Sequence, residues 1–155
     1  MKKDIPILEY TLLIAIVMGA LVFFIHMKNE NTDFCRKVFN GLVKGSYAVQ
    51  KFIDWEKLKA MNVDVGATYI KFTTEKQRSD YKQAFIKYLS LGFKQTGSKL
   101  DLFTNWRAYD RYTDKTVVAA DYRGKIILFT ISRDGKRKLI AIQWKEADAT
   151  NAKDR

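Results

Sequence analysis

Histidine and cysteine, which build many catalytic and metal sites, each occur only once in this chain of 155 residues. The single histidine, His26, lies in an apolar N-terminal segment. The rest of the chain therefore has no Ser–His or Cys–His dyad, and a zinc ion would lack its preferred ligands. A glycine-rich phosphate loop is also missing. We therefore expect no catalytic residue, no metal site and no cofactor, and the sequence predicts a protein that is not an enzyme.

Carboxylates are the remaining candidates for acid–base chemistry. The ones nearest the expected core elements are Asp54, Asp101, Asp110 and Asp121. None has a partner at a spacing that is diagnostic of catalysis, so we expect these side chains to form capping and turn hydrogen bonds.

One cysteine excludes a disulfide within the chain. Two alternatives stay open for Cys35. It forms a crosslink with its copy in a homo-oligomer, or it packs in the core as a small apolar residue.

Residues 10–27 contain no formally charged side chain if His26 is neutral. A bilayer core of roughly 30 Å needs about 20 helical residues, and lipid-exposed backbone must satisfy its own hydrogen bonds. The sequence therefore predicts a transmembrane anchor over residues 1–27, in contact with the lipid bilayer. A cleaved signal peptide is the alternative, although further apolar residues follow the only small pair, Gly19–Ala20. Residues 28–33 then form a juxtamembrane linker or continue the helix.

Acidic residues are outnumbered by basic ones, 17 to 28, which gives a net charge of +11. The excess lies after the apolar segment and is spread along the chain. A basic domain favours anionic neighbours, so anionic lipid or acidic polysaccharide are candidate partners, and nucleic acid is not expected. A hydrated basic face without a specific partner is the alternative.

Helical periodicity begins after the linker. The apolar residues that recur at helical spacing are Phe34, Val38, Leu42, Val49, Phe52 and Ile53. A turn and a short second helix are expected around Asp54, Trp55 and Leu58, and residues 62–66 interrupt the pattern.

A further amphipathic helix is expected after Thr74 and Gln77, which have the spacing of a capping box. Its expected buried stripe consists of Tyr81, Phe85, Tyr88 and Leu89, and its expected end lies at Gly92 and Gly97.

The apolar period changes to two after Ser98 and predicts four strands, at residues 100–109, 116–122, 125–132 and 136–145. The turn dipeptides Arg123–Gly124 and Asp134–Gly135 predict an antiparallel meander. The inward-facing sets are Ile127, Phe129 and Ile131 in the third strand, and Ile140, Ile142 and Trp144 in the last. The predicted fold class is α+β, with an N-terminal transmembrane helix followed by helices packed on a four-stranded antiparallel sheet. The predicted basic domain spans residues 34–146, and residues 147–155 form a polar tail.

Large aromatic residues mark the expected core. They line either the core itself or an apolar pocket, and they are Phe52, Trp55, Phe85, Trp106, Phe129 and Trp144.

Four segments of the basic domain resemble small extracytoplasmic members of the nuclear-transport-factor-two-like superfamily. They are FIDWEKL (52–58), NWRAY (105–109), TVVAADYRGK (116–125) and LIAIQW (139–144). The resemblance implies helices wrapped against a curved antiparallel sheet, often around an apolar cavity. It does not by itself imply a function, because this fold hosts enzymes, binding modules and assembly domains.

The N-terminal segment ILEYTLLIAIVMGALVFF (7–24) resembles the Flp/Tad-type pilins, in which Glu-Tyr precedes an apolar helix. Carried over to this chain, the resemblance makes Glu9 and Tyr10 the residues of a membrane anchor or a filament contact. The processing site of that family would fall between Asp4 and Ile5, where this sequence has Asp4 in place of the family's glycine.

Three functions follow as expectations. The preferred one is a membrane-anchored, non-enzymatic interaction or assembly domain that contacts other envelope proteins. It would lie in a bacterial inner membrane as a single-pass protein with an extracytoplasmic domain. The alternatives are a minor pilin or pseudopilin of a Tad-like system, and a cone-fold ligand-binding or enzymatic domain at the membrane surface. A closed, dry core would disfavour the ligand-binding alternative.

Overall fold

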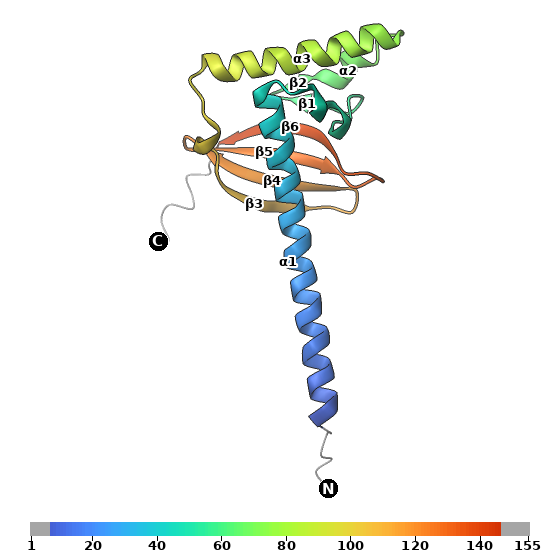
Figure 1. Ribbon diagram of the computed structural model, residues 1–155, viewed down its shortest axis with the longest axis vertical. Coiled ribbons are helices and arrows are strands. Elements are labelled where there is room, and N and C mark those ends of the chain that lie inside the picture. The colour runs from blue at the N-terminus through green and yellow to red at the C-terminus, as the bar shows by residue number, and fades with distance from the viewer. Residues whose placement is uncertain (1–6, 147–155) are drawn as a thin grey trace. The chain divides into compact units, whose positions relative to one another are not determined.

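The computed structural model describes the backbone of residues 7–146 and the side chains of residues 14–23 and 30–145. Two units divide the chain, Met1–Glu30 and Asn31–Arg155. Helix α1 (Ile7–Lys44) begins in the first unit and ends in the second, so residues 28–33 are helical (Figure 1).

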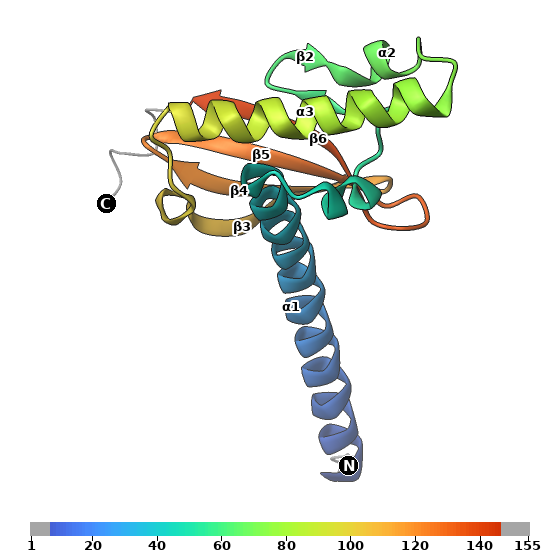
Figure 2. The ribbon, with the colours of Figure 1, turned by 45° about the horizontal axis from the view of Figure 1, so that its top comes forward.

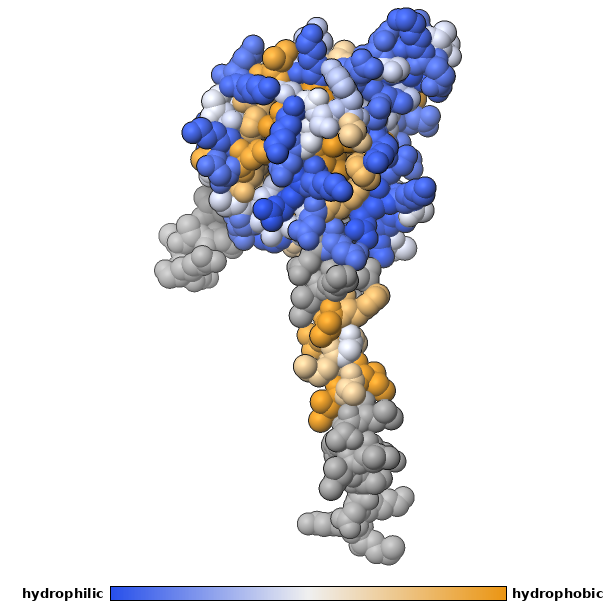
Figure 3. Space-filling model, in the orientation of Figure 1, coloured by the Kyte–Doolittle hydropathy of each residue, from blue (hydrophilic) through white to orange (hydrophobic). Residues whose placement is uncertain are grey.

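The first unit carries a run of exposed apolar side chains, coloured orange in Figure 3. The large ones are Ile14, Ile16, Val17, Met18, Leu21, Val22 and Phe23. Spanning a membrane takes about 20 apolar helical residues. Across the part of the chain that the structure describes, no helix has both the length and the apolarity for this. The predicted transmembrane anchor over residues 1–27, the single-pass topology and the inner-membrane localisation are therefore wrong. The side chains of Glu9 and Tyr10 lie outside the described residues, so their role stays a prediction.

The second unit is an α+β domain built on a six-stranded mixed sheet, in the order β2-β1-β6-β5-β4-β3. The strands are β1 (Lys59–Ala60), β2 (Val63–Asp64), β3 (Thr104–Arg111), β4 (Lys115–Tyr122), β5 (Lys125–Ser132) and β6 (Lys138–Glu146). Strands β3 to β6 form an antiparallel meander. Strand β1 pairs in parallel with β6 and antiparallel with β2. The prediction of a four-stranded, wholly antiparallel sheet is therefore wrong.

Strands β1 and β2 escape sequence-based prediction because each has only two residues, too few to show alternation. The turn between them consists of Met61 and Asn62, whose φ angles are 48° and 69°. Met-Asn is not one of the dipeptides that predict a two-residue hairpin turn. The short helix expected around Trp55 and Leu58 is replaced by a turn that leads into β1.

Helix α3 (Glu75–Gln95) and the part of α1 within the second unit lie on the same face of the sheet (Figures 1 and 2). Shorter helices complete the domain: η1 (Tyr47–Phe52), α2 (Val65–Tyr69) and η2 (Leu100–Leu102). The capping box predicted at Thr74 and Gln77 is confirmed, since both of its hydrogen bonds are present. The predicted stripe of α3 is wrong at Tyr88, which is 70% exposed, and Ile86 is buried instead.

The core centres on Phe129 of β5, which is fully buried. Its ring lies 5.1 Å from the ring of Phe39 in α1 and 5.1 Å from the ring of Trp106 in β3. Residues of α1, β3 and β5, distant in sequence, therefore meet in one aromatic cluster.

A register shift between Thr130 and Ile131 changes which residues of β6 face inward. Leu139 lies opposite Ile131, and Ile142 lies opposite Phe129. A bulge inserts one extra residue into a strand, so strict alternation fails across it. The predicted inward set is therefore wrong at Ile140, because Leu139 takes the buried position.

Cys35 is buried in the core, with 1% of its surface exposed. Burial raises the pKa of its thiol, because the thiolate would lose its hydration. Of the two alternatives for Cys35, the structure thus favours packing in the core over a crosslink between copies of the chain. A buried, protonated thiol is also a poor nucleophile.

We expect Cys35 to react slowly with iodoacetamide in the folded protein and rapidly in concentrated urea. The reason is that alkylation requires an exposed thiolate, which forms only after local or global opening. Mass spectrometry of timed samples would measure both rates. Rapid, complete labelling of the folded protein would contradict the burial of Cys35.

Candidate functional site

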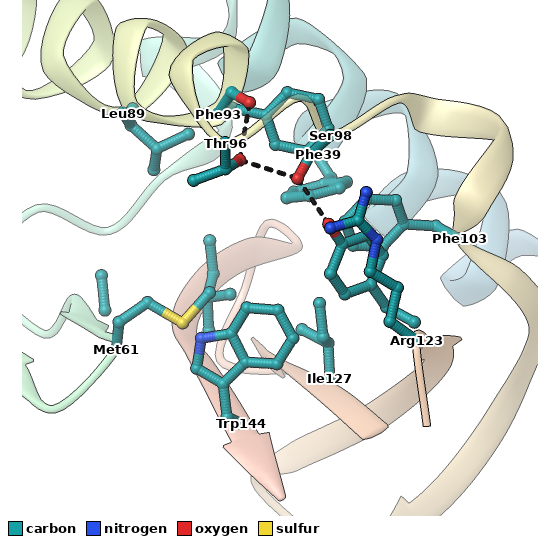
Figure 4. A pocket seen from close by; sticks show the side chains of 14 residues that line it. Phe39, Met61, Leu89, Phe93, Thr96, Ser98, Phe103, Arg123, Ile127 and Trp144 are labelled. Carbon is teal, nitrogen blue, oxygen red and sulfur yellow. Dashed lines mark hydrogen bonds between the residues drawn. The ribbon is translucent and has the colours of Figure 1, made fainter. Parts of the chain in front are cut away.

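An apolar pocket of about 420 Å³ opens within the second unit, beside α3 and the inward face of the sheet (Figure 4). Most of its surface is contributed by apolar atoms. Its lining residues come from α1, α3, the β1–β2 hairpin, the segment after α3, and strands β4 to β6. They are Phe39, Ala60, Met61, Leu89, Gly92, Phe93, Thr96, Ser98, Phe103, Tyr122, Arg123, Ile127, Ile142 and Trp144.

The floor of the pocket is continuous with the core. Phe39, Ile127 and Ile142 are each at most 4% exposed. The rim is solvent-accessible, since Thr96 and Arg123 are exposed and Trp144 is 43% exposed. The pocket is therefore an apolar cleft with an open, partly polar edge.

The short β1–β2 hairpin supplies one wall of this pocket. The backbone N–H of Met61 donates to the carbonyl of Ile142 at 2.8 Å, which ties the hairpin turn to β6. Figure 4 shows Met61 and Trp144 next to each other on this side of the pocket. Methionine is a flexible side chain that adapts readily to the shape of a neighbour.

Three hydroxyl groups form a chain at the opposite side of the pocket (Figure 4). The Thr96 hydroxyl donates to the carbonyl oxygen of Phe93 at 2.8 Å. Thr96 Oγ1 also lies 2.8 Å from Ser98 Oγ, and Ser98 Oγ hydrogen-bonds to the Tyr122 hydroxyl. The chain anchors the segment after α3 to the end of β4.

Arg123 lies next to this hydroxyl chain. Its guanidinium carbon is 5.3 Å from the centre of the Tyr122 ring, a cation–π geometry. The position of Arg123 follows from the hairpin that joins β4 to β5, in which Arg123 and Gly124 have φ angles of 48° and 74°. The predicted tight turn at this dipeptide is present.

Only one of the six aromatic residues singled out from the sequence, Trp144, lines the pocket. Phe129 and Trp106 stack on each other behind its floor. Trp55 and Phe85 pack edge to face, 5.7 Å apart, in the neighbouring part of the core.

Phe52, the sixth residue, contacts Phe34 and lines a second groove beside η1. This groove is basic, with the cations Arg36, Lys37, Lys44 and Lys51 and the single carboxylate Asp33. Lys37 and Lys51 lie over the ring of Phe52, at 5.7 and 5.1 Å from its centre.

The four carboxylates considered as catalytic candidates do not line the apolar pocket. Burial raises the pKa of Asp121, but hydrogen bonds from Asn105 and Arg107, each 2.8 Å long, lower it by more. A hydrogen bond with Tyr112 lowers the pKa of Asp110. Both side chains thus act as acceptors in hydrogen bonds that hold strand β3 and its turn.

Asp54 and Asp101, the other two, occupy local structural positions. The backbone carbonyl of Asp54 accepts from Lys57 N–H in the turn before β1, and Asp101 lies within η2. No carboxylate among the described residues is paired with another in a way that suggests acid–base chemistry.

Sequence reasoning missed most of the pocket. Gly92 was expected to end α3, but it lies inside the helix, and a Cβ at this position would meet no atom within 4 Å. A glycine in a helix interior destabilises the helix by about 1 kcal/mol relative to alanine. The sequence signals that do point to the pocket are the inward-facing residues Leu89, Ile127 and Ile142 and the aromatic residue Trp144.

Comparison of the chain with family models, with curated proteins and with solved structures finds no match. The two resemblances noted from sequence therefore stay predictions.

Proposed function

We propose that the second unit is a non-enzymatic binding domain for a small apolar molecule. The observation that carries this proposal is the apolar pocket of about 420 Å³ with an open rim. Ligand pockets in proteins typically measure about 300–1,000 Å³ and combine apolar walls with a few polar groups. A closed, dry core would have argued against ligand binding.

The lining residues favour binding over catalysis. Among the described residues that line the pocket, none is a carboxylate, a histidine or a cysteine. Those groups most often serve as general bases and nucleophiles. The hydroxyls present are engaged with one another and with a helix carbonyl, so they orient a ligand without activating it.

The expected affinity is modest. Burying about six methylene groups of an alkyl chain contributes about 5 kcal/mol, which corresponds to a Kd on the order of 0.1 mM. A natural ligand that fills the pocket more completely would bind more tightly.

Decanol is a suitable first probe because it is apolar, unbranched and uncharged. We expect the tryptophan emission of the full chain to change saturably as decanol is added, with a Kd on the order of 0.1 mM. The reason is that the exposed ring of Trp144 at the pocket rim becomes covered by the ligand.

Two matched variants locate this change. Trp144→Phe should lose the emission change, whereas Trp55→Phe should keep it, because Trp55 contacts Tyr69 and Phe85 rather than the pocket. An emission change that disappears with Trp55→Phe, or no saturable change at all, would contradict the proposed function.

A further inference from the structure

The hydroxyl chain at the pocket edge has no proton left to donate to a ligand. Because Thr96 spends its only hydroxyl proton on the carbonyl of Phe93, Ser98 must be the donor to Thr96 Oγ1. The Tyr122 hydroxyl must then donate to Ser98 Oγ. The hydrogen-bond chain thus runs from the Tyr122 hydroxyl through Ser98 and Thr96 to the carbonyl of Phe93 in α3. All three hydroxyl protons are used, so these oxygens can only accept a further hydrogen bond.

Arg123 is therefore the side chain at this edge that can donate hydrogen bonds to a ligand. Its guanidinium is positively charged and carries five N–H donors. Within the described residues, Arg123 forms no ion pair, and its contact is with the face of the Tyr122 ring. Figure 4 shows its side chain beside Ser98, across the pocket from Met61 and Trp144.

The two-residue hairpin between β4 and β5 requires a positive φ at both of its central residues, Arg123 and Gly124. The φ of Arg123, 48°, lies in the left-handed region, where Asn, Asp and Gly are strongly preferred over other residues. A residue kept in an unfavourable conformation at the edge of a cleft suggests a role for its side chain. The hairpin accounts for the backbone conformation, whereas the choice of arginine over asparagine or glycine at this position fits a role for its side chain at the pocket.

One feature of the pocket opposes an anion. Helix α3 ends at its edge, and a helix C-terminus carries a partial negative charge of about half a unit. That charge is reduced here, because Thr96 N–H and the Thr96 hydroxyl donate to the carbonyls of Gly92 and Phe93. The full charge of Arg123 outweighs what remains.

We infer that the ligand is an anionic amphiphile, whose carboxylate or other singly charged head group binds Arg123 while its alkyl or aromatic body fills the apolar pocket. This inference rests on the proposed function and deepens it. Carboxylates pair well with the planar guanidinium fork of arginine.

The test compares three probes with the same chain and different head groups, decanoate, decanol and decylammonium, on the full-length protein. We expect decanoate to bind about fivefold more tightly than decanol, the size of a partly exposed charge interaction, and decylammonium to bind most weakly. Competition with decanol, followed by tryptophan emission, would measure all three.

Arg123→Asn removes the charge without damaging the hairpin, since asparagine adopts the left-handed conformation more readily than arginine. We expect this variant to melt at the same or a higher temperature and to lose the preference for decanoate, so that its Kd values for decanoate and decanol become about equal. Arg133→Asn is the matched control: Arg133 follows the opposite end of β5, outside the pocket, and its loss lowers the net charge equally.

Each result decides a separate point. A decanoate preference that is lost in Arg123→Asn and kept in Arg133→Asn supports the inference. Equal binding of decanoate and decanol overturns it but leaves the apolar pocket as the binding site. A preference that falls equally in both variants also overturns it, because the net charge would then be the cause. Failure of all three probes to bind overturns the proposed function itself.

Discussion

Gly92→Phe should weaken decanol binding at least about tenfold while leaving the fold intact. Gly92 lies within α3 and lines the pocket, and a Cβ at this position meets no atom within 4 Å. The added ring therefore has room to occupy the space that the ligand needs. We expect the Kd for decanol to rise at least about tenfold, or about 1.4 kcal/mol. The tryptophan titration would measure this change, and thermal melting would check the fold.

Gly92→Ala is the matched control for the backbone effect of this substitution. Alanine in a helix interior is more stable than glycine by about 0.8–1 kcal/mol, so the melting temperature should rise. Its single methyl group fills little of the pocket, so decanol should still bind. If Gly92→Phe binds decanol as well as the Gly92→Ala protein does, the ligand does not occupy this pocket.

Phe129→Ala should destabilise the protein by about 3–5 kcal/mol, the usual cost of removing a buried phenylalanine. This is a large share of the roughly 5–15 kcal/mol that stabilises a typical domain. Phe129 is fully buried and contacts Phe39 and Trp106, so its removal leaves a cavity between α1 and the sheet. Urea denaturation followed by circular dichroism would give the change in the free energy of unfolding.

Tyr88→Ala serves as the comparison for this core substitution. The helical pattern of the sequence predicts that Tyr88 is buried, whereas the structure leaves it 70% exposed. Its removal should change the free energy of unfolding by less than about 0.5 kcal/mol, as is usual for surface positions. Similar losses for the two variants would mean that the packing described for α3 and β5 is incorrect.

Local patterns in the sequence were sufficient to predict the long elements of the second unit. The capping box at Thr74 and Gln77 predicted where α3 begins. The tight-turn dipeptide Arg123–Gly124 and the period-two alternation predicted the β4–β5 hairpin. These features depend on neighbours in sequence, so one chain is enough to recognise them.

The pocket could not be predicted because it depends on contacts between distant segments. Strand β1 is too short to show alternation, and its parallel pairing with β6 joins residues about 80 positions apart. The bulge that brings Leu139 into the core in place of Ile140 leaves no mark in the alternation itself. Without β1 and its turn, the wall that holds Met61 is missing, and so is the pocket.

The N-terminal prediction failed for a different reason. It depends on composition, because a long uncharged apolar run in a sequence predicts a membrane span. Within the described residues, no helix has the required combination of length and apolarity. Exposed apolar side chains remain on the first unit, among them Met18, and they offer an alternative surface for any apolar probe.

Methionine-methyl NMR therefore tests the central claim most directly, because it separates that surface from the pocket. The chain has four methionines, at positions 1, 18, 27 and 61. Met61 lines the pocket, and the other three belong to the first unit. With carbon-13-labelled methionine methyl groups, saturating decanol should shift the Met61 resonance and leave the other three in place. Shifts of the Met18 resonance with no change at Met61 would contradict the account, since the ligand would then bind the exposed apolar helix rather than the pocket.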